Sequence, residues 1–235
     1  MNTIVSLYSQ TNQEIANFLK SFNNINVDLI YATSKDTMHV LKSDLKNMLK
    51  LGVPHISTYS LIIEEHTVLY NNKTEPVSEQ LDFNSYKYIC KKLKKKGFHH
   101  YEVSNFAIPG FESKHNLTYW DNNEYYGFGL GAHGYINNMR YENTRNFNKY
   151  LNEEYRLNEL LISTQEEMEN ELILGLRKLK GVSVSEFEER FGISMFKMFK
   201  IEDALDKKDL ILDEGFIRIN EDKLYISNEI LNEIM

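Results

Sequence analysis

The chain has 235 residues and a mass of 27.7 kDa, enough for one large domain or two modest ones. Hydrophobic residues make up 42% and charged residues 26%, which argues against a disordered or fibrous protein. No apolar run reaches the roughly 18 residues that a membrane span needs. The first twenty residues also lack the basic-then-apolar pattern of a secretory signal.

The chain contains a single cysteine, Cys90, which excludes an internal disulfide and an all-cysteine metal centre built by this chain alone. We therefore expect a cytoplasmic protein. The net charge is −7, and residues 181–235 account for −6 of it, with seven Lys/Arg against thirteen Asp/Glu. Nucleic-acid binding draws on cationic side chains, so this acidic region disfavours nucleic acid as a partner.

Helices and strands alternate in the N-terminal part of the sequence. Apolar residues at helical spacing predict helices at residues 11–22, 37–51 and 81–96. Gly52 and Gly97 follow the last two of these helices, as is typical of helix ends. Short apolar runs predict strands at residues 26–32, 55–63 and 101–104. This alternation predicts parallel βαβ units, and therefore an α/β fold that is part of a barrel or of a doubly wound sheet.

The C-terminal part has a different pattern. Residues 115–145 are rich in aromatic residues and are expected to be irregular. Helices are then predicted at residues 166–179, 185–191 and 196–207, followed by β-like runs at residues 210–212, 216–219 and 224–226. Three helices followed by a small hairpin are typical of a winged-helix unit. We therefore expect two domains, residues 1–160 and residues 161–235.

The segment His115-Asn-Leu-Thr-Tyr-Trp120 is the most informative part of the aromatic stretch. A neutral histidine can donate a ring nitrogen to an iron centre, and flat aromatic faces can flank a flat tetrapyrrole. The alternative is structural, because a histidine can equally be hydrogen-bonded in a loop beside a core tryptophan.

Two further patterns are weaker. Gly129-x-Gly-x-x-Gly134 formally matches a dinucleotide-binding fingerprint, but no helical pattern follows, and residues 135–140 are predicted to form a turn. We expect these glycines to let the backbone approach a ligand or another strand closely. His99 and His100 are adjacent, so in a strand they point to opposite faces and cannot ligate one metal ion together.

Taken together, these segments resemble the radical S-adenosylmethionine proteins related to oxygen-independent coproporphyrinogen III oxidase, and within them the haem-chaperone branch. The most specific match is His-Asn-x-x-Tyr-Trp, and the order and spacing agree from about residue 10 to the C-terminus. The resemblance implies the C-terminal part of a radical SAM partial (β/α) barrel followed by a winged-helix-like α+β domain. The matching segments are residues 26–31, 55–61, 101–107 with Pro109-Gly110, 115–120, 126–133 and 174–177.

The resemblance also implies which residues contact ligands. In the haem-chaperone branch the His-Asn-x-x-Tyr-Trp motif is associated with haem binding. The candidate haem-binding residues are therefore His115, Asn116, Tyr119 and Trp120. Of the family's S-adenosylmethionine contacts, only Ala107 and the backbone near His133 have counterparts here.

Two departures from the family limit what the chain is expected to do. The family's Cys-x-x-x-Cys-x-x-Cys motif holds a [4Fe–4S] cluster, whereas this chain has only Cys90, which matches none of the three positions. The family pattern Tyr-Gly-Leu-Pro-Gly-Gln-Thr is here Tyr31-Ala-Thr-Ser-Lys-Asp-Thr37, so that Asp36 replaces a cofactor-contacting glutamine. We therefore expect no radical chemistry from this chain alone.

Without the preceding strands of a family barrel, the strand at residues 26–32 would have an open edge, which is a liability. We expect marginal stability, self-association or pairing with a separately encoded N-terminal half.

Three functions stay open. The chain could be a haem-chaperone-like protein that binds haem or porphyrin. It could also be the C-terminal part of a porphyrinogen oxidase completed by another chain, or a non-catalytic interaction module. A DNA-binding role for the winged-helix-like part is disfavoured, because Glu202, Asp203 and Asp206 lie on the helix that would enter the groove. The sequence does not identify a haem acceptor.

Overall fold

A computed structural model describes residues 21–235 and divides into two compact units, Met1–Ser113 (unit 1) and Lys114–Met235 (unit 2). The predicted helix at residues 11–22 falls almost entirely outside the described residues. The predicted domain boundary near residue 160 lies inside unit 2, and the division into domains there stays a proposal. Within the described range, every helix is too short or too polar to cross a membrane. Each unit is described by itself below.

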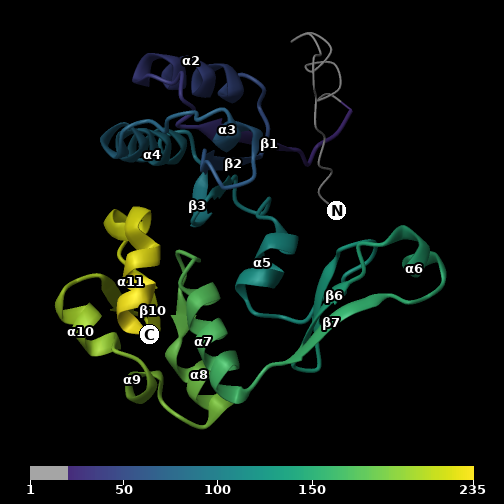
Figure 1. Ribbon diagram of the computed structural model, residues 1–235. Helices are drawn as coiled ribbons and strands as arrows, with labels where there is room; N and C mark the ends of the chain where they lie inside the picture. The colour runs from purple at the N-terminus through teal and green to yellow at the C-terminus, as the bar shows by residue number, and fades with distance from the viewer. Residues whose placement is uncertain (1–20) are drawn as a thin grey trace. The chain divides into compact units, whose positions relative to one another are not determined.

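The described part of unit 1, residues 21–113, contains a four-stranded sheet in the order β1-β2-β4-β3 and the helices α2, α3 and α4. The parallel pairing of the first two strands confirms the predicted βαβ unit. The elements are β1 (Asn26–Tyr31), α2 (Met38–Leu49), β2 (His55–Ser60), α3 (Val68–Asn71), α4 (Glu79–Lys94), β3 (His99–Glu102) and β4 (Asn105–Ala107) (Figure 1).

The expectation of parallel pairing is wrong beyond β2. The third predicted strand, at residues 101–104, is instead the end of β3 and the turn that follows it. β4 then pairs antiparallel with both β3 and β2. The physical reason is the length of the connection, because a two-residue turn can only reverse the chain, whereas a parallel strand needs a crossover of a dozen or more residues.

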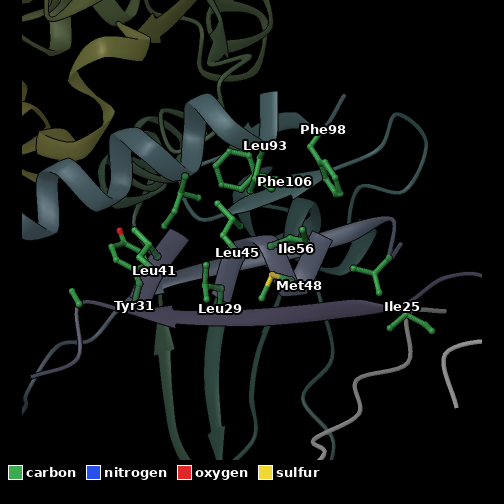
Figure 2. Close-up of a cluster of buried hydrophobic side chains, with 13 residues drawn as sticks. Ile25, Leu29, Tyr31, Leu41, Leu45, Met48, Ile56, Leu93, Phe98 and Phe106 are labelled. Atoms are coloured by element: carbon green, nitrogen blue, oxygen red, sulfur yellow. The ribbon is translucent and has the colours of Figure 1, made fainter. Parts of the chain in front are cut away.

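The core of unit 1 lies between one face of this sheet and the helices α2 and α4. Thr37 caps the N-terminus of α2, and Ser78 caps the N-terminus of α4. In each case the side-chain hydroxyl accepts a hydrogen bond from a backbone N–H in the first turn, at 3.3 Å. Figure 2 shows side chains from the helices and the strands pointing toward one another. The fully buried members of this cluster include Leu45, Ile56, Ile89, Leu93 and Phe106.

On the other face of the sheet, His55 lies at the centre of a network of polar side chains. Its Nδ1 lies 2.6 Å from Oδ1 of Asn26, and its Nε2 lies 2.7 Å from the hydroxyl of Tyr101. Since the amide oxygen can only accept, Nδ1 carries the proton and the Tyr101 hydroxyl donates to Nε2. The Ser57 hydroxyl also donates to Asn26 Oδ1, at 3.1 Å. Burial lowers the pKa of His55, so the neutral imidazole that this network requires is favoured.

Unit 2 begins with α5 (Lys114–Trp120) and an antiparallel sheet in the order β5-β6-β7. The expectation that residues 115–145 are irregular is therefore wrong. Asn137 and Asn138 have φ values of 51° and 58°, which make the two-residue turn that joins β5 to β6. The predicted turn at residues 135–140 is thus the centre of a hairpin. The elements are β5 (His133–Ile136), β6 (Met139–Asn143), α6 (Phe147–Leu151) and β7 (Arg156–Leu161), and β6 and β7 form a long ribbon that leads to α6 (Figure 1).

The rest of unit 2 confirms the predicted winged-helix outline, with a small sheet in the order β8-β10-β9. The predicted helix at residues 196–207 is broken, because Phe199 has extended backbone angles. The elements are α7 (Thr164–Gly175), β8 (Val182–Ser183), α8 (Val184–Phe191), α9 (Met195–Met198), α10 (Ile201–Asp206), β9 (Leu210–Asp213), β10 (Phe216–Ile219), η1 (Glu221–Ile226) and α11 (Ser227–Ile234).

The predicted strand at residues 224–226 is wrong. These residues end the 3₁₀ helix η1, whose first turn is capped by the Asn220 side chain. Helix α11 follows directly, with Ile230, Leu231 and Ile234 buried at helical spacing. The burial of this apolar stripe explains why the chain stays helical here.

The His55 network predicts a pH dependence for the stability of the chain. Because the pKa of His55 is lowered in the folded state, the unfolded chain binds a proton at pH values where the folded chain does not. The free energy of unfolding should therefore fall as the pH drops below about 6.5, the ordinary histidine pKa. Urea unfolding followed by circular dichroism at pH 7.5 and 5.5 should show a smaller loss for His55→Gln than for the wild type. Equal losses in the two proteins would contradict this role of His55.

Candidate functional site

The glycine run in unit 2 lets the chain pack closely against itself. A Cβ atom on Gly127 would lie 2.3 Å from the carbonyl oxygen of His133, and one on Gly134 would lie 2.1 Å from the Tyr141 ring. The Tyr141 hydroxyl accepts the N–H of Gly127 at 2.9 Å. Of the predicted glycines, close approach is confirmed for Gly134 but not for Gly129, where a Cβ atom would have no neighbour within 4 Å. Gly127 and Gly134 pack against β5 and β6, and not in a nucleotide-binding βαβ unit.

The register of the β5-β6-β7 sheet gathers six side chains on one face. His133 lies opposite Glu142, and Tyr135 lies opposite Arg140. Across the next pair of strands, Leu160 lies opposite Arg140 and Asn158 lies opposite Glu142. Residues directly opposite one another in an antiparallel pair share a face. The face therefore carries a histidine, an arginine, a carboxylate, an amide, the ring of a tyrosine and the apolar side chain of a leucine.

These six residues form the floor of a cavity of about 440 Å³ within unit 2. Its other walls come from the α5–β5 connection and from α7. A cavity of this size, with aromatic walls and a few polar groups, is typical of small-molecule sites. The remaining lining residues are Tyr119, Asn122, Asn123, Tyr125, Gly134, Tyr141 and Leu174.

The motif at residues 115–120 forms helix α5 rather than the predicted loop. His115 and Tyr119 are one helical turn apart, so they lie on the same side of α5, and their rings meet edge to face at 4.9 Å. Tyr119 in turn packs edge to face on Tyr125, with ring centroids 4.4 Å apart. His115 itself is exposed to solvent, and the Tyr119 ring that it contacts lines the cavity.

Asn116 and Trp120 lie one position further round α5 and do not line the cavity. The Trp120 ring lies 5.9 Å from the guanidinium of Arg177, near the end of α7. Its indole Nε1 is buried and has no hydrogen-bond partner within residues 21–235. The structure therefore divides the four predicted haem-binding residues, with His115 and Tyr119 on the cavity side and Trp120 on the side of Arg177.

Polar contacts fix the C-terminal end of α5 against α7 and α8. Lys178 forms an ion pair with Asp121, and the Asn122 amide lies 3.5 Å from Glu171. Glu171 is itself bound by Arg190 at 2.8 Å. Burial raises the pKa of Glu171, and the Arg190 guanidinium opposes this shift. This network holds Tyr119 and the following residues in place beside the cavity.

The residues predicted to contact S-adenosylmethionine lie in different units. His133 lines the cavity of unit 2 and lies 4.0 Å from Glu142. Ala107 is fully buried in β4 of unit 1, between His55 of β2 and His99 of β3. Asp36, the replacement for the family's glutamine, binds the backbone N–H of Thr33 at 3.0 Å and thus holds a local turn.

The side chains present do not fit a [4Fe–4S] cluster. Such a cluster needs three thiolates from the family motif, whereas the one cysteine, Cys90, lies on α4 and packs against the unit 1 core. The part of the chain that the structure describes holds no group of three or more His, Cys, Asp or Glu placed to bind a metal ion. As predicted for adjacent strand residues, His99 is exposed and His100 is buried.

The sequence interpretation missed Tyr125, Tyr135 and Arg140 as site residues. The available signal was the Asn137-Asn138 pair, since two residues that tolerate positive φ between apolar or aromatic runs are typical of a hairpin. With that hairpin recognised, alternation along β5 and β6 would have placed Tyr135 and Arg140 on one face.

Comparison with known proteins agrees with this architecture. The family model described as the HemN C-terminal domain matches residues 162–229. Coproporphyrinogen III oxidase (HemN) from Escherichia coli, described in its title as a radical SAM enzyme, matches with a TM-score of 0.78 at 16% identity. This match covers 95% of the present chain and 58% of the other, and it shows a shared fold. The fold is therefore that of the C-terminal part of a HemN-like protein.

Sequence relatives narrow the class further. The heme chaperone HemW of Lactococcus lactis subsp. lactis (strain IL1403) is 42% identical over 223 residues, which are 91% of this chain and 59% of that protein. The heme chaperone HemW of Bacillus subtilis (strain 168) is 38% identical over 219 residues, which are 88% of this chain and 56% of that protein. The chain belongs to the family of the heme chaperone HemW. It spans a little over half the length of these curated relatives.

Because Gly134 and the Tyr141 ring are in close contact, we expect a single added methyl group at position 134 to destabilise the fold. Gly134→Ala forces the Tyr141 ring away from its place beside Gly127, so we expect a loss of about 1–3 kcal/mol in the free energy of unfolding. The measurement is urea unfolding followed by Trp120 fluorescence.

The control is a double-mutant cycle with Tyr141→Leu, whose shorter side chain leaves room for the added methyl group. Gly134→Ala should cost clearly less in that background. An equal cost in both backgrounds would show that the ring contact is not the cause.

Proposed function

We propose that this chain binds haem or a closely related porphyrin in the cytoplasm, in the manner of a haem carrier and not of a catalyst acting on its own. The observation that carries the proposal is the aromatic cavity of unit 2, with the exposed imidazole of His115 packed against its Tyr119 wall. The similarity to proteins named heme chaperone HemW supports the same ligand.

His115 has the properties that an iron ligand needs. It is exposed, and no hydrogen bond or ion pair holds its ring nitrogens within the described residues. A neutral imidazole nitrogen in this state is available to an iron ion. The edge-to-face contact with Tyr119 positions the ring without using either nitrogen. In this proposal Tyr119 is a packing face for the tetrapyrrole, whereas Trp120 supports α5 from its other side.

A porphyrinogen oxidase completed by a second chain is the alternative function. The observation that favours it is the open edge of β1, whose Ile30 is 58% exposed and whose one strand partner within residues 21–235 is β2. A further strand or a second copy of the chain could pair there. A [4Fe–4S] cluster would then need three cysteines other than Cys90, which packs against the unit 1 core.

A haemin titration of the chain followed by absorbance tests the proposed function. We expect saturable binding of about one haem per chain, with a shift of the Soret band. His115→Ala should change the band position and weaken binding about tenfold or more, which corresponds to the loss of roughly 1.4 kcal/mol.

The matched control is His39→Ala, since His39 is also an exposed histidine on a helix but lies in α2 of unit 1. It should titrate like the wild type. Equal effects of the two substitutions, or no saturable binding by a chain shown to be folded, would overturn the proposal.

A further inference from the structure

The guanidinium of Arg140 stands out because it is a cation on the floor of the cavity without a carboxylate partner. No acidic side chain among residues 21–235 lies within ion-pair distance of it. The guanidinium lies over the ring of Tyr135, with its carbon 5.7 Å from the ring centroid. Other arginines of unit 2, such as Arg145 and Arg190, do form ion pairs.

The carboxylates near Arg140 are engaged elsewhere. Glu142, on the same face of β6, accepts from Arg145 at 2.8 Å. Glu166 accepts from the backbone N–H and the hydroxyl of Ser163 at 2.8 and 2.7 Å, which closes the capping box of α7. Glu124 accepts the backbone N–H of Asn137 at 2.5 Å. The donors of Arg140 are therefore available to a carboxylate that comes with a ligand.

The surroundings of Arg140 favour a flat apolar ligand body. Leu160 lies directly opposite it on β7, and Tyr135 lies opposite it on β5. The walls contributed by Tyr119 and Tyr125 are aromatic as well. Arg140 is exposed, so its guanidinium is accessible to the carboxylate of an incoming ligand, and a hydrogen bond between two charged groups is stronger than one between neutral groups. The ligand class that combines a broad flat ring with carboxylates is the porphyrin carboxylic acids.

We propose that Arg140 binds a propionate carboxylate of the porphyrin that occupies this cavity. The inference rests on the proposed function and adds the orientation of the ligand. Glu142 lies two residues along the same face, about 7 Å away, and already occupies the Arg145 guanidinium, so that end of the cavity offers no free cation to a carboxylate. The propionate edge therefore lies at the Arg140 end, near the Asn137-Asn138 turn, and the apolar edge lies toward Glu142 and His133.

The test uses metal-free protoporphyrin IX and its dimethyl ester, which has the same ring but no free carboxylate. Metal-free porphyrin removes the contribution of an iron ligand such as His115. In the full-length wild-type chain, titrations followed by porphyrin fluorescence should give tighter binding of the diacid than of the ester. Arg140→Gln should weaken diacid binding about tenfold, as expected for one hydrogen bond to a charged group, and leave ester binding unchanged.

Two further variants separate charge from folding. Arg218→Gln is the control, because Arg218 also lies on a strand of unit 2 but pairs with Asp213 and does not line the cavity. It should bind both porphyrins like the wild type. Arg140→Lys keeps the charge and should recover part of the diacid affinity.

Other results of these titrations would overturn the inference. Equal weakening of the diacid and the ester by Arg140→Gln would overturn the inference, because it would show a packing role. Unchanged diacid binding would overturn it as well, and haemin binding that depends on His115 would then leave the proposed function standing. No saturable binding of haemin or of either porphyrin by the wild-type chain would overturn both.

Discussion

The register of the β5-β6-β7 sheet is the constraint on which the candidate site depends. Side chains alternate between the two faces of a strand, so a slip of one residue would replace Tyr135 and Arg140 on the cavity face by their neighbours. The two-residue turn at Asn137-Asn138 fixes the register at one end of the hairpin. The contact of Gly134 with the Tyr141 ring fixes it further along, because no other residue type leaves room for that ring.

The two units differ in whether their polar side chains have partners within the described part of the protein. In unit 1 His55 bridges Asn26 and Tyr101, and this hydrogen-bonded arrangement stabilises the fold. In unit 2 the cavity face holds groups without internal partners, namely the Arg140 guanidinium on its floor and the His115 imidazole beside its Tyr119 wall. Both side chains are exposed, and the proposed haem site uses both of them as ligand contacts.

The sequence predicted much of the fold because its strongest signals are periodic. Helices α2, α4, α7 and α8 follow apolar spacing and end-capping residues, and β1, β2, β9 and β10 are short apolar runs. The β5-β6-β7 sheet was missed for a physical reason. All six residues of β7 are exposed, so no buried face imposes alternation on it, and β5 begins within a glycine-rich run. The family motif located His115 and Tyr119, but the Arg140 position follows only from strand pairing.

Hydrogen–deuterium exchange of the chain with and without protoporphyrin IX tests the location of the ligand most directly. The account predicts slower exchange in the segments that surround the unit 2 cavity, residues 114–125, 133–142 and 156–161, with unit 1 unchanged. Slower exchange confined to unit 1, or to the winged-helix elements beyond α7, would contradict it.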